Sequence, residues 1–99
     1  MGLNPLGTVK TIVEAAGMGI SYAYDDLVFL EHNSFLLQFT GNGHEVTIHV
    51  NSEADEATVH GDIERLRQVA LDHAMQFTRG TRYTLVPAGE DAIRIEFSA

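Results

Sequence analysis

Histidine is the residue type in this chain whose side chain could most readily do chemistry. The 99 residues contain no cysteine and five histidines, namely His32, His44, His49, His60 and His73. Imidazole is the commonest metal ligand in proteins, and it titrates near neutral pH. If residue 60 lies in a helix, His60 and Glu64 are four residues apart on one helical face, a spacing at which two side chains can share an ion. A polar sheet face could add His49 and Glu45 to this pair.

The spacing of these histidines is nevertheless weak evidence for a metal. The sequence contains no HExxH or HxH motif and no 2-His-1-carboxylate pattern. Solvated histidines on loops and surfaces are the commoner arrangement. We therefore assign no metal site and no cofactor, and we keep His49, His60 and Glu64 only as candidate ligands.

Other residues that could support catalysis lack the surroundings that catalysis requires. The carboxylate pair Asp25-Asp26 precedes an expected strand and Glu90-Asp91 lies in an expected turn, where carboxylates cap backbone amides and stay solvated. General acid or base work would need an apolar pocket to raise the pKa of one of them. No serine lies in a GxSxG motif. We assign no catalytic residue, and the sequence favours a protein that is not an enzyme.

Composition narrows the class of protein and of partner. A mass of 10.9 kDa fits a single domain over residues 1–99. Fourteen acidic residues against six basic ones give a net charge of -8, which repels nucleic acid. The longest apolar runs, such as residues 27–30, are far shorter than the roughly 20 residues of a membrane span. We expect an acidic cytoplasmic protein that binds neither nucleic acid nor membrane.

Helical periodicity marks two segments. The first helix is expected to be capped by Thr8 and to end near Gly17, with a buried stripe consisting of Val9, Ile12, Val13, Ala16 and Ile20. The second is expected over Asp62 to about Arg79, ended by Gly80. Its start is ambiguous: Ser52 with Asp55 resembles a capping box, whereas residues 58–61 could form a short strand. We favour the longer helix.

Two turn signals between the helices predict a three-stranded antiparallel meander. A two-residue turn at Asn33-Ser34 places Leu30 opposite Leu37, and a type I′ turn at Asn42-Gly43 places Leu37 opposite Ile48. The two registers agree on one core face, which comprises Val28, Leu30, Phe35, Leu37, Phe39, Val46, Ile48 and Val50. Residues 81–86 and 92–97 then read as a closing hairpin with its apolar side chains inward, namely Ile93, Ile95 and Phe97.

These elements predict an α+β fold with a single antiparallel five-stranded sheet, two helices on one face and the order α-β-β-β-α-β-β. In the order of its elements, though in no motif residue, the chain resembles the front part of the small acidic dimeric chaperones that escort type III secretion effectors. The final helix of that family is missing here. The resemblance implies a chaperone-like or adaptor role and identifies no functional residue.

Two apolar groups fall outside the expected core. Leu27 and Phe29 are expected beside Leu36 on the outer face of the sheet, and Leu71 and Met75 on the flank of the second helix. Exposed apolar surface of this kind favours a non-catalytic interaction or adaptor domain that binds another protein or itself as a homodimer. Alternatively, residues 1–8 cover the patch. A second class remains, a small-molecule or metal-binding domain, even an enzyme, using histidines and carboxylates between the sheet and the second helix.

Overall fold

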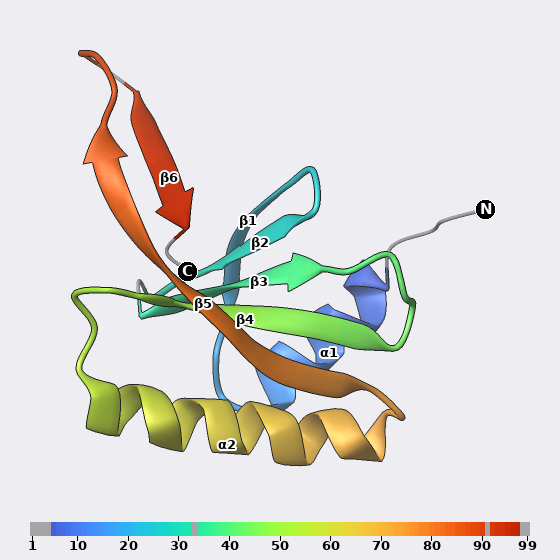
Figure 1. The fold of residues 1–99 in the computed structure, drawn as a ribbon. Coiled ribbons are helices and arrows are strands. Elements are labelled where there is room, and N and C mark those ends of the chain that lie inside the picture. The colour runs from blue at the N-terminus through green and yellow to red at the C-terminus, as the bar shows by residue number, and fades with distance from the viewer. Residues whose placement is uncertain (1–4, 33, 91, 98–99) are drawn as a thin grey trace.

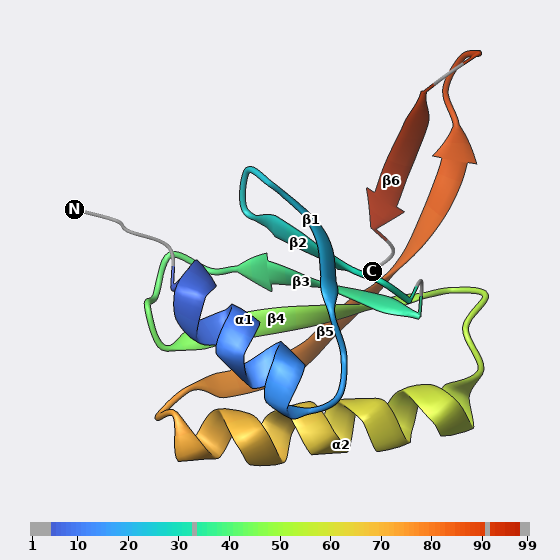
Figure 2. The ribbon, with the colours of Figure 1, turned by 180° about the vertical axis from the view of Figure 1, so that it is seen from behind.

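Two helices and six strands form the fold, which a computed structural model describes for residues 5–32, 34–90 and 92–97. In chain order the elements are α1 (Leu6–Ala15), β1 (Ile20–Tyr24), β2 (Leu27–Leu30), β3 (Phe35–Phe39), β4 (Glu45–Asn51), α2 (Glu56–Asp72), β5 (Gln76–Pro87) and β6 (Ile93–Phe97). The strands make one sheet in the order β1-β2-β3-β4-β5-β6, which curls into a half-barrel (Figure 1). Both helices lie against the same side of it (Figure 2).

The sheet is mixed, because β4 and β5 run parallel while every other neighbouring pair is antiparallel. The helix α2 makes the crossover that a parallel pair requires. The α+β class and the two helices on one face agree with the prediction, but the five-stranded antiparallel sheet and the order α-β-β-β-α-β-β are wrong. Two misread segments explain the difference: residues 20–24 form a strand, and residues 76–80 belong to β5 rather than to the second helix.

Helix α1 begins after Pro5, whose carbonyl accepts a hydrogen bond of 2.9 Å from the N–H of Val9. Thr8 lies inside the first turn and does not cap it, so the predicted cap is wrong. The stripe through Val9, Ile12 and Val13 is buried, as predicted. The chain leaves the helix through Gly17, whose φ of +85° is strained for any side chain but costs glycine little.

The three central strands carry the predicted core face. Leu37 pairs with Ile48, which confirms the register of β3 on β4, although the positive φ in their turn belongs to Gly41 rather than to Asn42 and Gly43. The β2–β3 register is wrong, because Val28 rather than Leu30 pairs with Leu37. Four residues separate β2 from β3, where the prediction had two, so the pairing shifts by two and every side chain keeps its face. Asn33 of the predicted turn lies outside the described residues. All eight predicted core residues are buried in one cluster.

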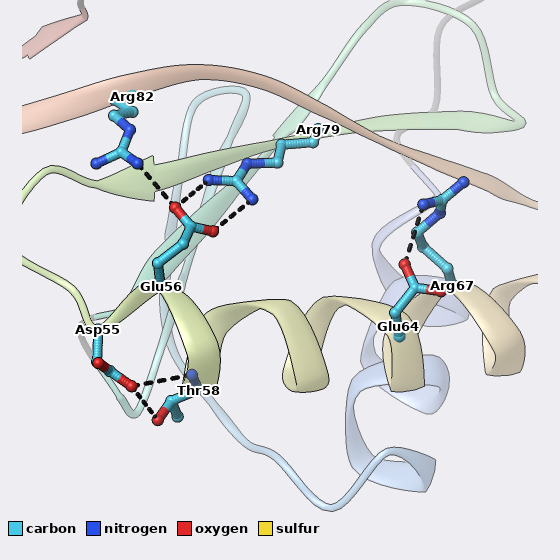
Figure 3. Close-up of polar contacts among 7 residues, drawn as sticks. All are labelled: Asp55, Glu56, Thr58, Glu64, Arg67, Arg79 and Arg82. Carbon is cyan, nitrogen blue, oxygen red and sulfur yellow. Dashed lines mark hydrogen bonds and ion pairs between the residues drawn. The ribbon is translucent and has the colours of Figure 1, made fainter.

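Helix α2 includes residues 58–61, as the longer prediction requires, but its N-cap is Asp55, so the predicted cap at Ser52 is wrong. The Asp55 carboxylate accepts hydrogen bonds from the N–H and the hydroxyl of Thr58, at 3.0 and 2.8 Å, and these bonds lower the pKa of Asp55 (Figure 3). The helix ends at Asp72, and Ala74, with φ of +57°, turns the chain into β5. No helix in the described ranges combines the length and the apolar content that a bilayer crossing requires.

Candidate binding surface

The C-terminal hairpin of β5 and β6 extends beyond the rest of the sheet as an arm (Figure 1). Its strands pair in regular register from Tyr83 opposite Phe97 to Pro87 opposite Ile93. Directly opposed residues share a face, and so do alternate residues along a strand. One face of the arm therefore carries only apolar or aromatic side chains, and we define this arm face by Tyr83, Leu85, Pro87, Ile93, Ile95 and Phe97.

A bulge in β5 determines where the arm begins. Ile48 pairs with Arg79 and Val50 with Arg82, so β5 has one residue more than β4 over this stretch. Such a bulge bends a strand and increases its twist. Gly80 and Thr81 are the residues opposite His49 at this point.

Two arginines hold the bulged part of β5 to the start of α2. Arg79 donates two hydrogen bonds of 2.8 Å to the two carboxylate oxygens of Glu56, and Arg82 donates a third of 2.7 Å (Figure 3). The hydrogen bonds between Arg79 and Glu56, together with the paired charges, lower the pKa of Glu56 and raise that of Arg79. The side chains of Arg79 and Arg82, on either side of the bulge, thus point to the face of the sheet that the helices cover. The arm begins after Arg82.

The base of the arm lies over the sheet face that the helices do not cover. The rings of Phe97 and His49 are 4.6 Å apart, and Tyr83 is buried. Leu36, which pairs with His49, is only 1% exposed although it is not part of the core cluster beneath the helices. This face therefore has a small core of its own.

A hydrogen-bonded chain runs through that small core. Gln38 donates through Nε2 to the Asp26 carboxylate at 2.8 Å, so its Oε1 is the acceptor that faces His49 Nε2 at 2.8 Å. Nδ1 lies 3.1 Å from the carbonyl oxygen and 3.2 Å from the hydroxyl of Thr81. Both ring nitrogens of His49 are occupied by protein partners.

The candidate metal ligands do not come together. His49 is on the face away from the helices, whereas His60 and Glu64 are on α2. Within residues 5–32, 34–90 and 92–97, no group of three or more His, Asp or Glu side chains is placed to hold a metal ion. A groove of about 490 Å³ runs between α2 and the first residues of β4 and β5; it includes Glu64, which pairs with Arg67 at 3.1 Å, but neither candidate histidine.

The five predicted interface residues occupy different environments. Leu71 is 67% exposed on α2, and Leu27 and Phe29 are partly exposed on β2. Leu36 and Met75 are 1% and 3% exposed, so the expectation that they form open surface is wrong. Leu36 is covered on the second face of the sheet, and Met75 belongs to the main core because α2 ends before it. Whether Leu27, Phe29 or Leu71 contacts a partner stays a prediction.

The arm face is the apolar surface that sequence reasoning missed. Alternation correctly placed Ile93, Ile95 and Phe97 on one side, but the inward prediction is wrong for Ile93 and Phe97, which are 69% and 46% exposed. Leu85, on the same face, is 41% exposed. The alternating pattern marks which side chains share a face, and only the three-dimensional course of the arm shows that most of this face has no cover.

His32 is a partly buried histidine with an unusual environment. Its Nδ1 accepts a hydrogen bond of 3.3 Å from the N–H of Ser34, its ring lies edge-on to Phe35 at 4.6 Å, and its buried Nε2 has no partner among the described residues. Burial lowers the pKa of His32, and the negative charge of Asp62 only partly offsets this effect.

Acidification below the ordinary histidine pKa is therefore expected to destabilise the fold. In the unfolded chain His32 becomes protonated near pH 6.5, whereas in the folded protein it stays neutral to lower pH. The contribution of His32 to the free energy of unfolding is therefore fully present above pH 6.5 and is lost as the pH falls below that value. Urea denaturation at several pH values between about 7.5 and 5 measures the slope, above the range in which carboxylates titrate. A His32→Asn variant should show a shallower slope, and an unchanged slope would contradict the assignment.

No family model matches the sequence, and neither the curated proteins nor the solved structures include a match. The resemblance to type III secretion chaperones depended on three strands between the helices, and the structure has four.

Proposed function

We propose that the protein is an interaction domain that acts by binding a second polypeptide chain at the arm face, and that this chain is a second copy of itself. The observation that supports the proposal is the exposure of Leu85, Ile93 and Phe97 on a face whose side chains are all apolar or aromatic. Contiguous exposed apolar surface marks interaction sites more often than isolated apolar residues do.

The shape of the arm supports binding at this face. A two-stranded hairpin is at best marginally stable in water unless another element packs on it. At the base of the arm Tyr83 is buried and the ring of Phe97 lies against that of His49, whereas Leu85 and Ile93 are exposed. A partner that covers these side chains would supply the missing packing.

A second copy is the partner that the arm itself favours. The arm ends in an edge strand and has an apolar face, and a two-fold contact requires only one self-complementary surface on each copy. A short chain also gains more from burying apolar surface than a large protein does.

Light scattering behind a sizing column, at concentrations up to about 100 µM, tests the proposal. We expect the wild type to show twice the chain mass of 10.9 kDa. Ile93→Ser should shift the protein to the monomer, because it places a hydroxyl in the arm face. Leu71→Ser is the matched control: Leu71 is similarly exposed, at 67% against 69%, but lies on α2, and this variant should stay dimeric.

A wild type that remains at the monomer mass over this range would contradict the proposal. A dimer that Leu71→Ser breaks and Ile93→Ser leaves intact would place the contact on α2 instead of on the arm.

A further inference from the structure

The two edges of the sheet differ in how open they are to another strand. The order β1 to β6 leaves β1 and β6 at the edges. The pairing of β1 is irregular between Ile20 and Tyr22, and irregular edges resist further pairing. The register of β6 on β5 continues without interruption from Ile93 to Phe97. The regular edge is therefore β6.

The backbone of β6 presents a defined set of groups to this open edge. The N–H of Ala88 donates to the carbonyl of Ala92 at 3.0 Å next to the hairpin turn. Bonded and non-bonded pairs alternate along an antiparallel ladder, so Arg94 and Glu96 direct their N–H and C=O groups to β5. Ile93, Ile95 and Phe97 direct theirs away from β5.

We propose that two copies join through their β6 strands, antiparallel, about a two-fold axis at Ile95; this inference rests on the proposed function. In this register Ile95 lies opposite the partner's Ile95, and Ile93 lies opposite the partner's Phe97. The outward N–H and C=O groups of each strand then meet those of the other, as strand addition at an edge requires. The two sheets become one continuous sheet.

The charged side chains of β6 favour this register over the registers shifted by one residue. With the axis at Ile95, Arg94 lies opposite the partner's Glu96, and this happens twice by symmetry. Arg94 and Glu96 form non-bonded pairs across the new contact, where opposed side chains approach most closely. Moving the axis by one residue, to Arg94 or to Glu96, keeps the backbone bonds possible but places two like charges opposite each other.

The apolar side chains agree with the same arrangement. A two-fold axis perpendicular to the sheet keeps the arm faces of both copies on one side. The exposed side chain of Ile93 then lies beside the partner's Phe97, and the two arm faces form one continuous apolar strip. In the isolated chain Arg94 and Glu96 bond to each other at 2.7 Å while staying more than half exposed, so both are available to a second strand.

Charge-reversal variants test the register. Arg94→Glu and Glu96→Arg should each weaken the wild-type dimer by about 10-fold or more in Kd, since each opposes like charges at two symmetric positions. If only the general repulsion between acidic chains mattered, the two variants would change the Kd in opposite directions. Arg94→Glu makes the chain more acidic and would weaken the dimer, whereas Glu96→Arg makes it less acidic and would strengthen it. Weakening by both variants is the expected result.

Restoring opposite charges should restore the dimer. In an equimolar mixture of the two variants, the acidic pair of one chain faces the basic pair of the other, and mixed dimers should form with an affinity near that of the wild type. The double variant Arg94→Glu/Glu96→Arg, which keeps the net charge, should also dimerise with itself. Sedimentation equilibrium measures each Kd, and the unfolding midpoint of each variant confirms that its chain is folded.

The outcomes separate this inference from the function on which it rests. If both single variants dimerise as tightly as the wild type while Ile93→Ser does not, the β6 register is wrong and binding at the arm face stands. If mixing the variants restores nothing, the opposed Arg94 and Glu96 pairs are likewise wrong. A wild type that is monomeric throughout overturns both proposals.

Discussion

Replacing Leu36 with alanine is expected to lower the free energy of unfolding by about 2 to 5 kcal/mol, the range for a large apolar side chain removed from a closed site. Leu36 is 1% exposed and lies beside His49, on the face that the base of the arm covers. The removed methyl groups would leave a cavity there, because the neighbours of Leu36, Phe29 and His49, are held in place by the pairing of their own strands.

Leu71→Ala is the matched control for this measurement. It removes the same atoms from a side chain that is 67% exposed on α2, and its effect should stay within about 0.5 kcal/mol. Urea denaturation of both variants at one protein concentration gives the comparison, since dimer formation would make the midpoint depend on concentration. Equal effects of the two substitutions would mean that Leu36 is solvent-exposed in solution, as the sequence analysis expected.

The contrast between these two leucines shows what sequence periodicity can predict. It indicates which side chains share a face of the sheet, but not whether that face is covered. Alternation correctly separated the core face through Val28, Leu37 and Ile48 from the face that carries Leu36. What covers that second face depends on the return of residues 83–97 from the far end of the chain. No local pattern near Leu36 encodes such a long-range contact, and the residue was therefore assigned to the surface.

Strand β1 was not predicted, although Ile20, Tyr22 and Tyr24 alternate with small residues as in a strand. Only Ile20 is partly buried, and the four residues that follow are exposed, so this strand adds little to the core. Ile20 also fits the spacing of the preceding helix, to which it was assigned. The pair Asp25-Asp26 is the two-residue loop between β1 and β2, and Asp25 takes the positive φ, which aspartate tolerates better than most residues.

The start of β5 was misread because two periods fit the same residues. Ala70, Ala74 and Phe77 continue the helical spacing from Leu66, yet α2 ends at Asp72. The helical spacing is interrupted at Ala74, which has a positive φ. Glycine or asparagine usually occupies such a position, so the alanine gives no sequence signal for the end of the helix. Parallel pairing with β4 and the ion pairs of Arg79 and Arg82 with Glu56 hold residues 76–82 in the strand. These contacts cross more than 20 residues of sequence.

Gly80 is the position at which the two interpretations of this segment differ most. The sequence predicts a helix-terminating glycine, whereas the structure places it in the bulge of β5 opposite His49. A Cβ added there would collide with Cγ2 of Thr47 and approach Cε1 of His49 to 3.3 Å. Gly80→Ala is therefore expected to destabilise the fold by about 1 to 3 kcal/mol, the usual cost of overpacking.

A second glycine in the same chain serves as the control. Gly61 lies inside α2, and a Cβ added there meets nothing within 4 Å. Gly61→Ala should stabilise the protein by about 0.5 to 1 kcal/mol, since alanine loses less conformational freedom in a helix. Urea denaturation of the two variants should thus give changes of opposite sign.

The physical cause at Gly80 can be isolated with a third substitution. Gly80 does not have a positive φ, so alanine suits its backbone and the expected cost arises from the collision with Thr47. Thr47→Ser removes the colliding Cγ2, and the double variant should recover most of the stability that Gly80→Ala loses, a coupling that a double-mutant cycle measures directly. A glycine that ended a helix with positive φ would lose the same stability whether residue 47 is threonine or serine. Rescue by Thr47→Ser therefore requires β5 to begin before Gly80 and to lie beside β4.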